Sequence, residues 1–201
     1  MKKTGIMTAA AAVAVMCAFT GCALVGAADK KNKAPEKWYN ETLQYYKTGF
    51  ENGWKGVDPA DYHLKTGASV KAYGPSGEIE PEVKEEYKNS ADKFGYLLRD
   101  LDGDGTAEVL IGFDDGSAQT KFTEVCVWHS DFGAFNVMSA GDGYYMYLCN
   151  DNVLRVDSWY GSETRTEYMK YDHEGNSFIM VESDASLQPG KYELKSFSAA
   201  E

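Results

Sequence analysis

The chain has 201 residues, of which 43% are hydrophobic, and its 31 acidic and 20 basic residues give a formal net charge of −11 at pH 7. This acidity argues against nucleic acid and anionic lipid headgroups as direct partners of the folded part, because both attract basic surfaces. The length is sufficient for one domain with a sizeable hydrophobic core.

The N-terminus has the organisation of a secretion signal, in which Lys2 and Lys3 precede an uncharged, alanine-rich apolar run over residues 6–20. The run is short for a membrane span, which needs about 20 residues. Residues 19–23 read Phe-Thr-Gly-Cys-Ala and resemble a bacterial lipobox, with Phe19 where that pattern prefers leucine. We expect residues 1–21 to be a lipoprotein signal peptide and Cys22 to be lipidated. Ordinary cleavage near residues 25–28, which would release a secreted protein, is the alternative.

A change of pattern separates a tether from the folded part. Residues 22–36 are small, charged and proline-containing, which is typical of a flexible tether. We expect residues 37–201 to form a single α+β domain. Helical spacing predicts an amphipathic helix over residues 36–51, ended by Gly53 and packed through its aromatic stripe, and a second helix over residues 82–93. The stripe consists of Tyr39, Leu43, Tyr46 and Phe50.

An acidic loop over residues 100–108 reads Asp-Leu-Asp-Gly-Asp-Gly-Thr-Ala-Glu, with the spacing of a calcium loop. Calcium takes about six to eight oxygen ligands. We expect Asp100, Asp102 and Asp104 to supply side-chain oxygens and Thr106 its backbone carbonyl. Glu108 would close the site directly or through water.

The surroundings of the acidic loop argue against an EF-hand, which needs a bidentate acid at loop position 12, where this chain has Ile111. The flanks, residues 94–99 and 109–113, are strand-like. A β-loop-β calcium clip, similar to the D-x-D-x-D-G loops of integrin-type propeller blades, fits better. The alternative is an acidic turn without metal. We favour calcium because four acids in nine residues repel one another unless a cation neutralises them.

From residue 94 onward the chain consists of short β-type runs separated by turn-forming residues. Such spacing predicts an antiparallel meander. The expected architecture is α+β, with one or two N-terminal helices packed on a curved, mostly antiparallel sheet. After the clip, the expected strands are residues 122–129, 134–138, 144–149, 153–160, 165–171, 178–182 and 192–197.

Residues 96–111 combine a tyrosine, D-x-D-G-D-G and Glu-Val-Leu-Ile. This stretch resembles a signature of small secreted or lipid-anchored proteins of Gram-positive gut bacteria, with Val109 in place of the leucine that the family favours. The similarity continues in residues 152–156 and 168–171 and covers about the last half of the chain. Members of this family are mostly uncharacterised, so the resemblance implies calcium and an extracytoplasmic location without naming an activity.

Catalytic motifs are weak in this sequence. His63, His129 and His173 are widely separated, and there is no H-E-x-x-H, C-x-x-C, G-x-S-x-G or phosphate-binding glycine motif. We predict no catalytic residue and consider an enzyme less favoured than a binding protein. Cys126 and Cys149 are the candidate thiols of the folded domain, either as one disulfide or as two buried free thiols.

Aromatic residues of the predicted sheet are the candidates for ligand binding, above all Trp128, Trp159 and Tyr160. Exposed rings can stack on sugars or peptides, although cross-strand ring pairs that stabilise the sheet are the plainer interpretation. We therefore expect a calcium-binding extracytoplasmic lipoprotein with a structural metal, serving as a ligand-binding or scaffold module at the cell surface. A secreted hydrolase acting on cell-wall or dietary polymer is the alternative.

Overall fold

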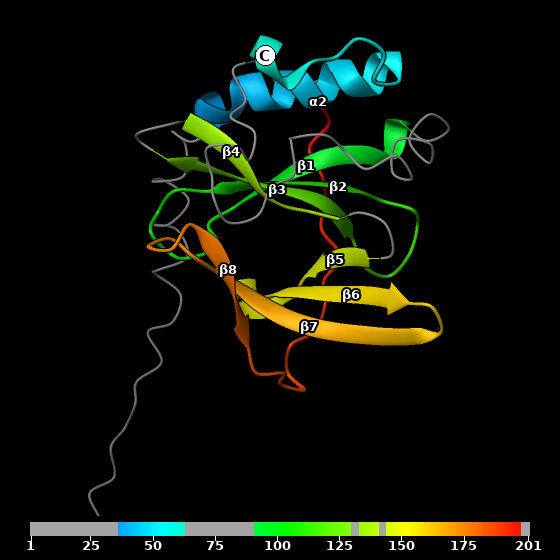
Figure 1. Ribbon diagram of the computed structural model, residues 1–201, viewed down its shortest axis with the longest axis vertical. Helices are drawn as coiled ribbons and strands as arrows, with labels where there is room; N and C mark the ends of the chain where they lie inside the picture. The colour runs from blue at the N-terminus through cyan, green and yellow to red at the C-terminus, as the bar shows by residue number, and fades with distance from the viewer. Residues whose placement is uncertain (1–35, 63–90, 130–132, 141–143, 198–201) are drawn as a thin grey trace, which may run out of the picture.

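The computed structural model describes residues 36–62, 91–129, 133–140 and 144–197. Within these residues one α-helix is followed by an eight-stranded antiparallel sheet (Figure 1), which confirms the α+β prediction. The predicted signal peptide, Cys22, nearly all of the tether and most of the second helix lie outside the described residues. The elements are η1 (Glu36–Tyr39), α2 (Asn40–Asn52), η2 (Pro59–Tyr62), η3 (Ala91–Lys93), β1 (Phe94–Arg99), β2 (Glu108–Phe113), β3 (Lys121–His129), β4 (Gly133–Ser139), β5 (Tyr144–Leu148), η4 (Asn150–Asn152), β6 (Leu154–Tyr160), β7 (Glu163–Asp172) and β8 (Ser177–Val181).

The first predicted helix is confirmed, with its first turn in 3-10 geometry as η1. Gly53 ends α2 in the left-handed region at φ 63°, and its amide donates to the carbonyl of Gly49. The buried side of α2 includes Leu43, Tyr46 and Phe50. These side chains form the first core with Phe94, Tyr96, Val109, Ile111, Phe113, Cys126 and Phe197, so α2 covers one face of β1, β2 and β3.

A second core lies on the opposite face of these strands. Leu110 of β2 and Val125 of β3 pack there in one cluster with Met146 of β5 and Leu154 of β6. The sheet bends between β3 and β5 (Figure 1), where Phe122 opposite Met146 is the one strand pair among the described residues. The molecule therefore has three layers, α2, then β1 to β4, then β5 to β8 (Figure 1).

The strands follow the order β1-β2-β3-β5-β6-β7-β8, with β4 paired to β3, so the chain is mostly a meander. The prediction of a strand over residues 192–197 is wrong. Only Lys195 pairs with β1, through a bridge to Tyr96. The segment crosses from one core to the other, because Leu194 packs against the second core and Phe197 lies in the first. Gly95 permits this close approach, since a β-carbon there would collide with the carbonyl oxygen of Lys195.

Both candidate thiols are free and buried. Cys126 belongs to the first core, with its sulfur 3.9 Å from the hydroxyl of Tyr46, and burial raises the pKa of its thiol. Cys149 packs in a small separate cluster with Val153 and Leu187. The structure therefore supports the free-thiol alternative. Among the residues it describes, no helix is both long and apolar enough to cross a membrane.

Candidate metal centre

The acidic loop connects two paired strands, as the β-loop-β prediction requires. Strands β1 and β2 pair from Phe94 opposite Phe113 to Arg99 opposite Glu108, so the loop leaves and re-enters the sheet at adjacent positions. Inside the loop, Leu101 is only 2% exposed and packs in the second core. This burial holds the loop against the body of the protein.

Backbone amides fix the shape of the loop. The Asp100 carboxylate accepts hydrogen bonds from the amides of Gly103 at 2.7 Å and Gly105 at 3.0 Å. Asp102 and Asp104 each accept, through Oδ1, the amide two residues further on. Gly103 and Gly105 have positive φ angles of 84° and 91°, a backbone conformation that residues with a side chain rarely adopt. The sequence thus encodes the turn locally, and Oδ2 of Asp102 takes no part in these turn bonds.

Three of the predicted ligands converge in an inner group made of Asp100, Asp102 and Glu108. Their carboxylate oxygens lie within 4.8 Å of one another. The Asp102 side chain is 9% exposed and Glu108 is 3% exposed. In the described part of the chain no hydrogen-bond donor reaches the buried Oδ2 of Asp102. A buried carboxylate oxygen without a donor is costly unless a cation compensates it.

Burial and mutual repulsion also raise the pKa values of carboxylates in the inner group. Burial, together with the negative charges of the neighbouring aspartates, raises the pKa of Glu108 from its ordinary value of 4.5 to about 8, although the hydrogen bond from the Leu101 amide lowers it. That amide donates to Oε2 of Glu108 at 2.7 Å. Burial also raises the pKa of Asp102. These acids repel one another in a poorly hydrated place, which is where a cation is most stabilising.

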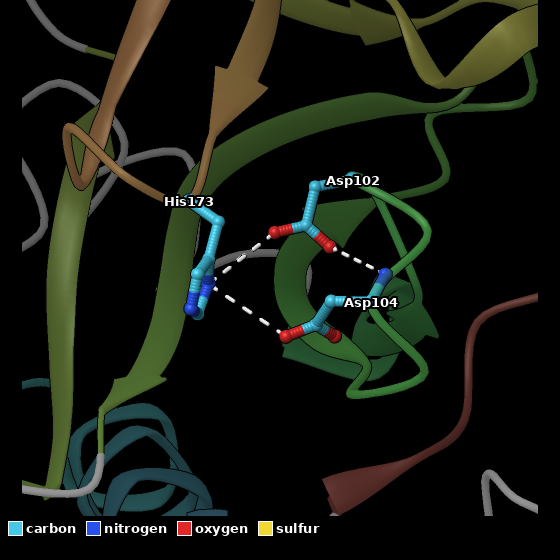
Figure 2. Close-up of side chains that lie close together, drawn as sticks. All are labelled: Asp102, Asp104 and His173. Carbon is cyan, nitrogen blue, oxygen red and sulfur yellow. Dashed lines mark hydrogen bonds and ion pairs between the residues drawn. The ribbon is translucent and has the colours of Figure 1, made fainter.

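A histidine that the sequence analysis did not connect with the loop lies beside it. His173, in the turn between β7 and β8, places Nδ1 at 3.5 Å from Oδ2 of Asp102 and 3.6 Å from Oδ2 of Asp104 (Figure 2). Asp102, Asp104 and His173 form an outer group whose potential ligand atoms also lie within 4.8 Å of one another. The sequence showed only the turn-forming residues around His173, and nothing in it indicated which loop the turn would meet.

Asn152 supports the loop from a third segment, η4. Its Nδ2 donates to the backbone carbonyl of Asp100 at 2.6 Å, and its Oδ1 accepts a hydrogen bond from Nε of Arg99 at 2.7 Å. Asn152 has a positive φ of 57°, which asparagine tolerates better than most residues. In the sequence, Asn152 is only the first residue of the stretch 152–156 that continues the family resemblance, and nothing there indicates its contact with the acidic loop.

Four of the predicted metal ligands are therefore brought together in two overlapping groups, with Asp102 common to both. The acidic groups could hold a metal ion. Thr106 lies in the same loop, where its amide donates to Oδ1 of Asp104. Its carbonyl as a metal ligand stays a prediction.

The aromatic candidates are dispersed over the sheet. Trp128 is partly buried against the first core and stacks on Trp38 with ring centroids 4.3 Å apart. Trp159 is 41% exposed and makes an edge contact with Tyr145 at 5.5 Å. Tyr160 is the last residue of β6. Trp128 and Trp159 thus belong to separate ring pairs, and only Trp159 presents a large exposed surface among the described side chains of this set.

Comparisons of the chain with protein-family models, with curated proteins and with solved structures found no match. The chemistry of the acidic loop and its neighbours is therefore what indicates a function.

Proposed function

We propose that this protein is a calcium-binding extracytoplasmic lipoprotein in which the metal is structural. The observation that carries the proposal is the inner group, in which carboxylate oxygens of Asp100, Asp102 and Glu108 lie within 4.8 Å of one another. Two of these acids are almost fully buried, since the side chain of Asp102 is 9% exposed and Glu108 is 3% exposed. Calcium would neutralise the negative charges of these carboxylates and stabilise the loop that connects the paired strands β1 and β2. The lipid anchor at Cys22 is the part of the proposal that derives from the N-terminal sequence alone.

The donor set favours calcium over softer metals, because the inner group offers only carboxylate oxygens. Calcium binds such hard ligands in flexible arrangements, whereas magnesium needs a tighter octahedral site and dehydrates reluctantly. Asp100, Asp102 and Glu108 would hold the ion, with Asp104 and the Thr106 carbonyl as the further ligands that the loop spacing predicts. The role is structural because the loop joins paired strands and is fixed to the core through Leu101.

At the cell surface such a domain would act as a ligand-binding or scaffold module. Trp159 supports this role, because a large ring that is 41% exposed on β6 can stack on a glycan or a peptide. The anchor would hold the module at the membrane, and the tether would leave its surface accessible.

The calcium proposal predicts that calcium raises the melting temperature of the metal-stripped protein. Extracellular modules bind calcium with a Kd of about 10⁻⁴ to 10⁻³ M, and ligand at about 100 times its Kd stabilises by about 2.7 kcal/mol. We therefore expect a rise of a few degrees at several millimolar calcium, and a smaller rise with magnesium. Differential scanning calorimetry in chelator and in calcium measures it.

Asp102→Asn should abolish this response, because it keeps the size of the side chain and removes its charge. Asp184→Asn is the matched control. Asp184 is exposed and accepts the amide of Ser186, two residues on, in the same kind of turn, so its variant should respond to calcium like the wild type. A melting temperature that does not change when calcium is added to the metal-stripped wild type would refute the structural-metal proposal.

A further inference from the structure

The outer group differs from the inner group in its donor atoms. Asp102 and Asp104 contribute carboxylate oxygens, and His173 adds an imidazole nitrogen from another part of the chain (Figure 2). We propose that these three residues form a second metal site, for a borderline divalent transition metal such as zinc. The site would join the acidic loop to the turn between β7 and β8.

The distances in the outer group suit coordination better than hydrogen bonding. Nδ1 of His173 lies 3.5 Å and 3.6 Å from the two Oδ2 atoms, longer than a good hydrogen bond. Two ligands of a tetrahedral zinc ion, each bonded at about 2.0–2.1 Å, lie about 3.3 Å apart. Small side-chain adjustments would therefore bring the three atoms to the corners of a zinc site.

A second observation points to a ligand at this place. Oδ2 of Asp102 is buried, the side chain is only 9% exposed, and this oxygen faces His173 without a hydrogen-bond donor (Figure 2). The Oδ1 atoms of Asp102 and Asp104 accept loop amides, so the Oδ2 atoms are the ones directed to the histidine. Nδ1 of His173 can form an ion pair with these oxygens only when the imidazole is protonated, whereas a metal ion bound among the three atoms would supply positive charge and use the imidazole as a ligand.

Exposure makes the outer group accessible to a metal from solvent. The side chains of Asp104 and His173 are 31% and 51% exposed. Zinc could thus reach the site and keep a water molecule as its fourth ligand. Imidazole suits zinc and related metals, whereas calcium takes oxygen ligands. The inner and outer groups therefore differ in metal preference although they share Asp102.

Zinc titration of the metal-stripped, full-length protein by isothermal calorimetry near neutral pH tests the proposal. His173→Ala should weaken zinc binding at least about tenfold, because even residues that only support a metal ligand contribute about 10–100-fold to affinity. The same variant should keep the calcium-dependent rise in melting temperature. His129→Ala, which removes a histidine at the end of β3, is the matched control and should bind zinc like the wild type.

A reciprocal variant separates this proposal from the calcium proposal. Glu108→Gln changes the inner group alone, so it should lose the calcium response and retain zinc binding. Cobalt provides a spectroscopic readout, since its visible absorption bands should change in His173→Ala and remain in His129→Ala. Zinc affinity in His173→Ala equal to that of the wild type would overturn the outer site and leave the calcium site standing. A full calcium response in Glu108→Gln would overturn the calcium site and leave the outer site standing.

Discussion

The two oxygens of Asp102 have different environments, and this difference gives the residue its importance. Oδ1 accepts the amide of Asp104 and shapes the turn, whereas Oδ2 is buried without a hydrogen-bond donor and lies 3.5 Å from Nδ1 of His173. Replacing Asp102 therefore changes the loop and both the inner and the outer group. Glu108 belongs to the inner group alone and His173 to the outer group alone, so their substitutions separate the two proposals.

Asn152 should contribute to the stability of the loop without being a ligand. Asn152→Gly keeps the positive φ accessible but removes the bonds to the Asp100 carbonyl and to Arg99. We expect the free energy of unfolding to fall by about 1–2 kcal/mol and the calcium response to weaken. Urea denaturation and calorimetry measure the two effects.

The neighbouring Asp151 provides the control for this variant. Asp151 has the same φ of 57° and is exposed. Asp151→Gly adds the same freedom to the unfolded chain, so the difference between the two variants reports the side-chain bonds of Asn152. Equal losses in stability would show that these bonds do not support the loop.

The spacing of residues close together in the sequence identifies the candidate ligands of the acidic loop but not the partner that comes from elsewhere in the chain. Asp100, Asp102, Asp104 and Glu108 were identifiable because their alternation and the glycines of the turn lie within nine residues. His173 was not, because it reaches the loop only after β7 and β8 have formed their turn. A histidine among turn-forming residues has no sequence feature that names its spatial partner.

Helix α2 buries one residue that its sequence pattern does not predict. Its predicted stripe includes Leu43 and Tyr46, both buried, and Gly53 ends the helix as expected. Tyr45 is also fully buried, although it lies outside the predicted stripe. Its ring contacts those of Trp54 and Tyr62, which follow the helix. Tyr45 is buried because the segment after the helix folds back against it, and the helical spacing of apolar residues cannot predict such a contact.

The packing of α2 on the sheet can be tested with two adjacent residues. Leu43 is completely buried in the first core, whereas Gln44 is exposed. Leu43→Ala should reduce the free energy of unfolding by about 2–5 kcal/mol because it leaves a cavity. Gln44→Ala should change it by no more than about 0.5 kcal/mol. Equal losses in the free energy of unfolding for the two variants, measured by urea denaturation, would contradict the packing of α2 on the sheet through Leu43.

At the scale of the whole molecule, regular spacing of the β runs predicted an antiparallel meander but not its bend. The bend depends on pairing between strands that are far apart in the chain. Among the described residues, Phe122 opposite Met146 is the one strand pair between β3 and β5. Strand β2 is buried along its entire length between the two cores, so its sequence shows no alternation of apolar and polar residues. The layered arrangement follows from these long-range contacts.

The buried acid at the start of β2 couples the stability of the whole molecule to pH. In the unfolded chain a glutamate loses its proton near its ordinary pKa of 4.5, whereas Glu108 in the folded, metal-free protein has a pKa of about 8. Between these values the folded state binds more protons than the unfolded state, so the free energy of unfolding falls as the pH rises. Asp114 and Asp115 have lowered pKa values, so their contributions change below this window.

We therefore expect the metal-stripped protein to be less stable at about pH 8 than at about pH 5.5. Since one pKa unit corresponds to about 1.4 kcal/mol, the loss should be on the order of 1–3 kcal/mol. Glu108→Gln has no proton to lose at this position, so its stability should vary less over the same interval. Calcium should reduce the slope of the wild type, because the ion stabilises the charged carboxylate. Equal pH slopes for the wild type and Glu108→Gln, measured by urea denaturation in chelator, would show that Glu108 does not carry the raised pKa.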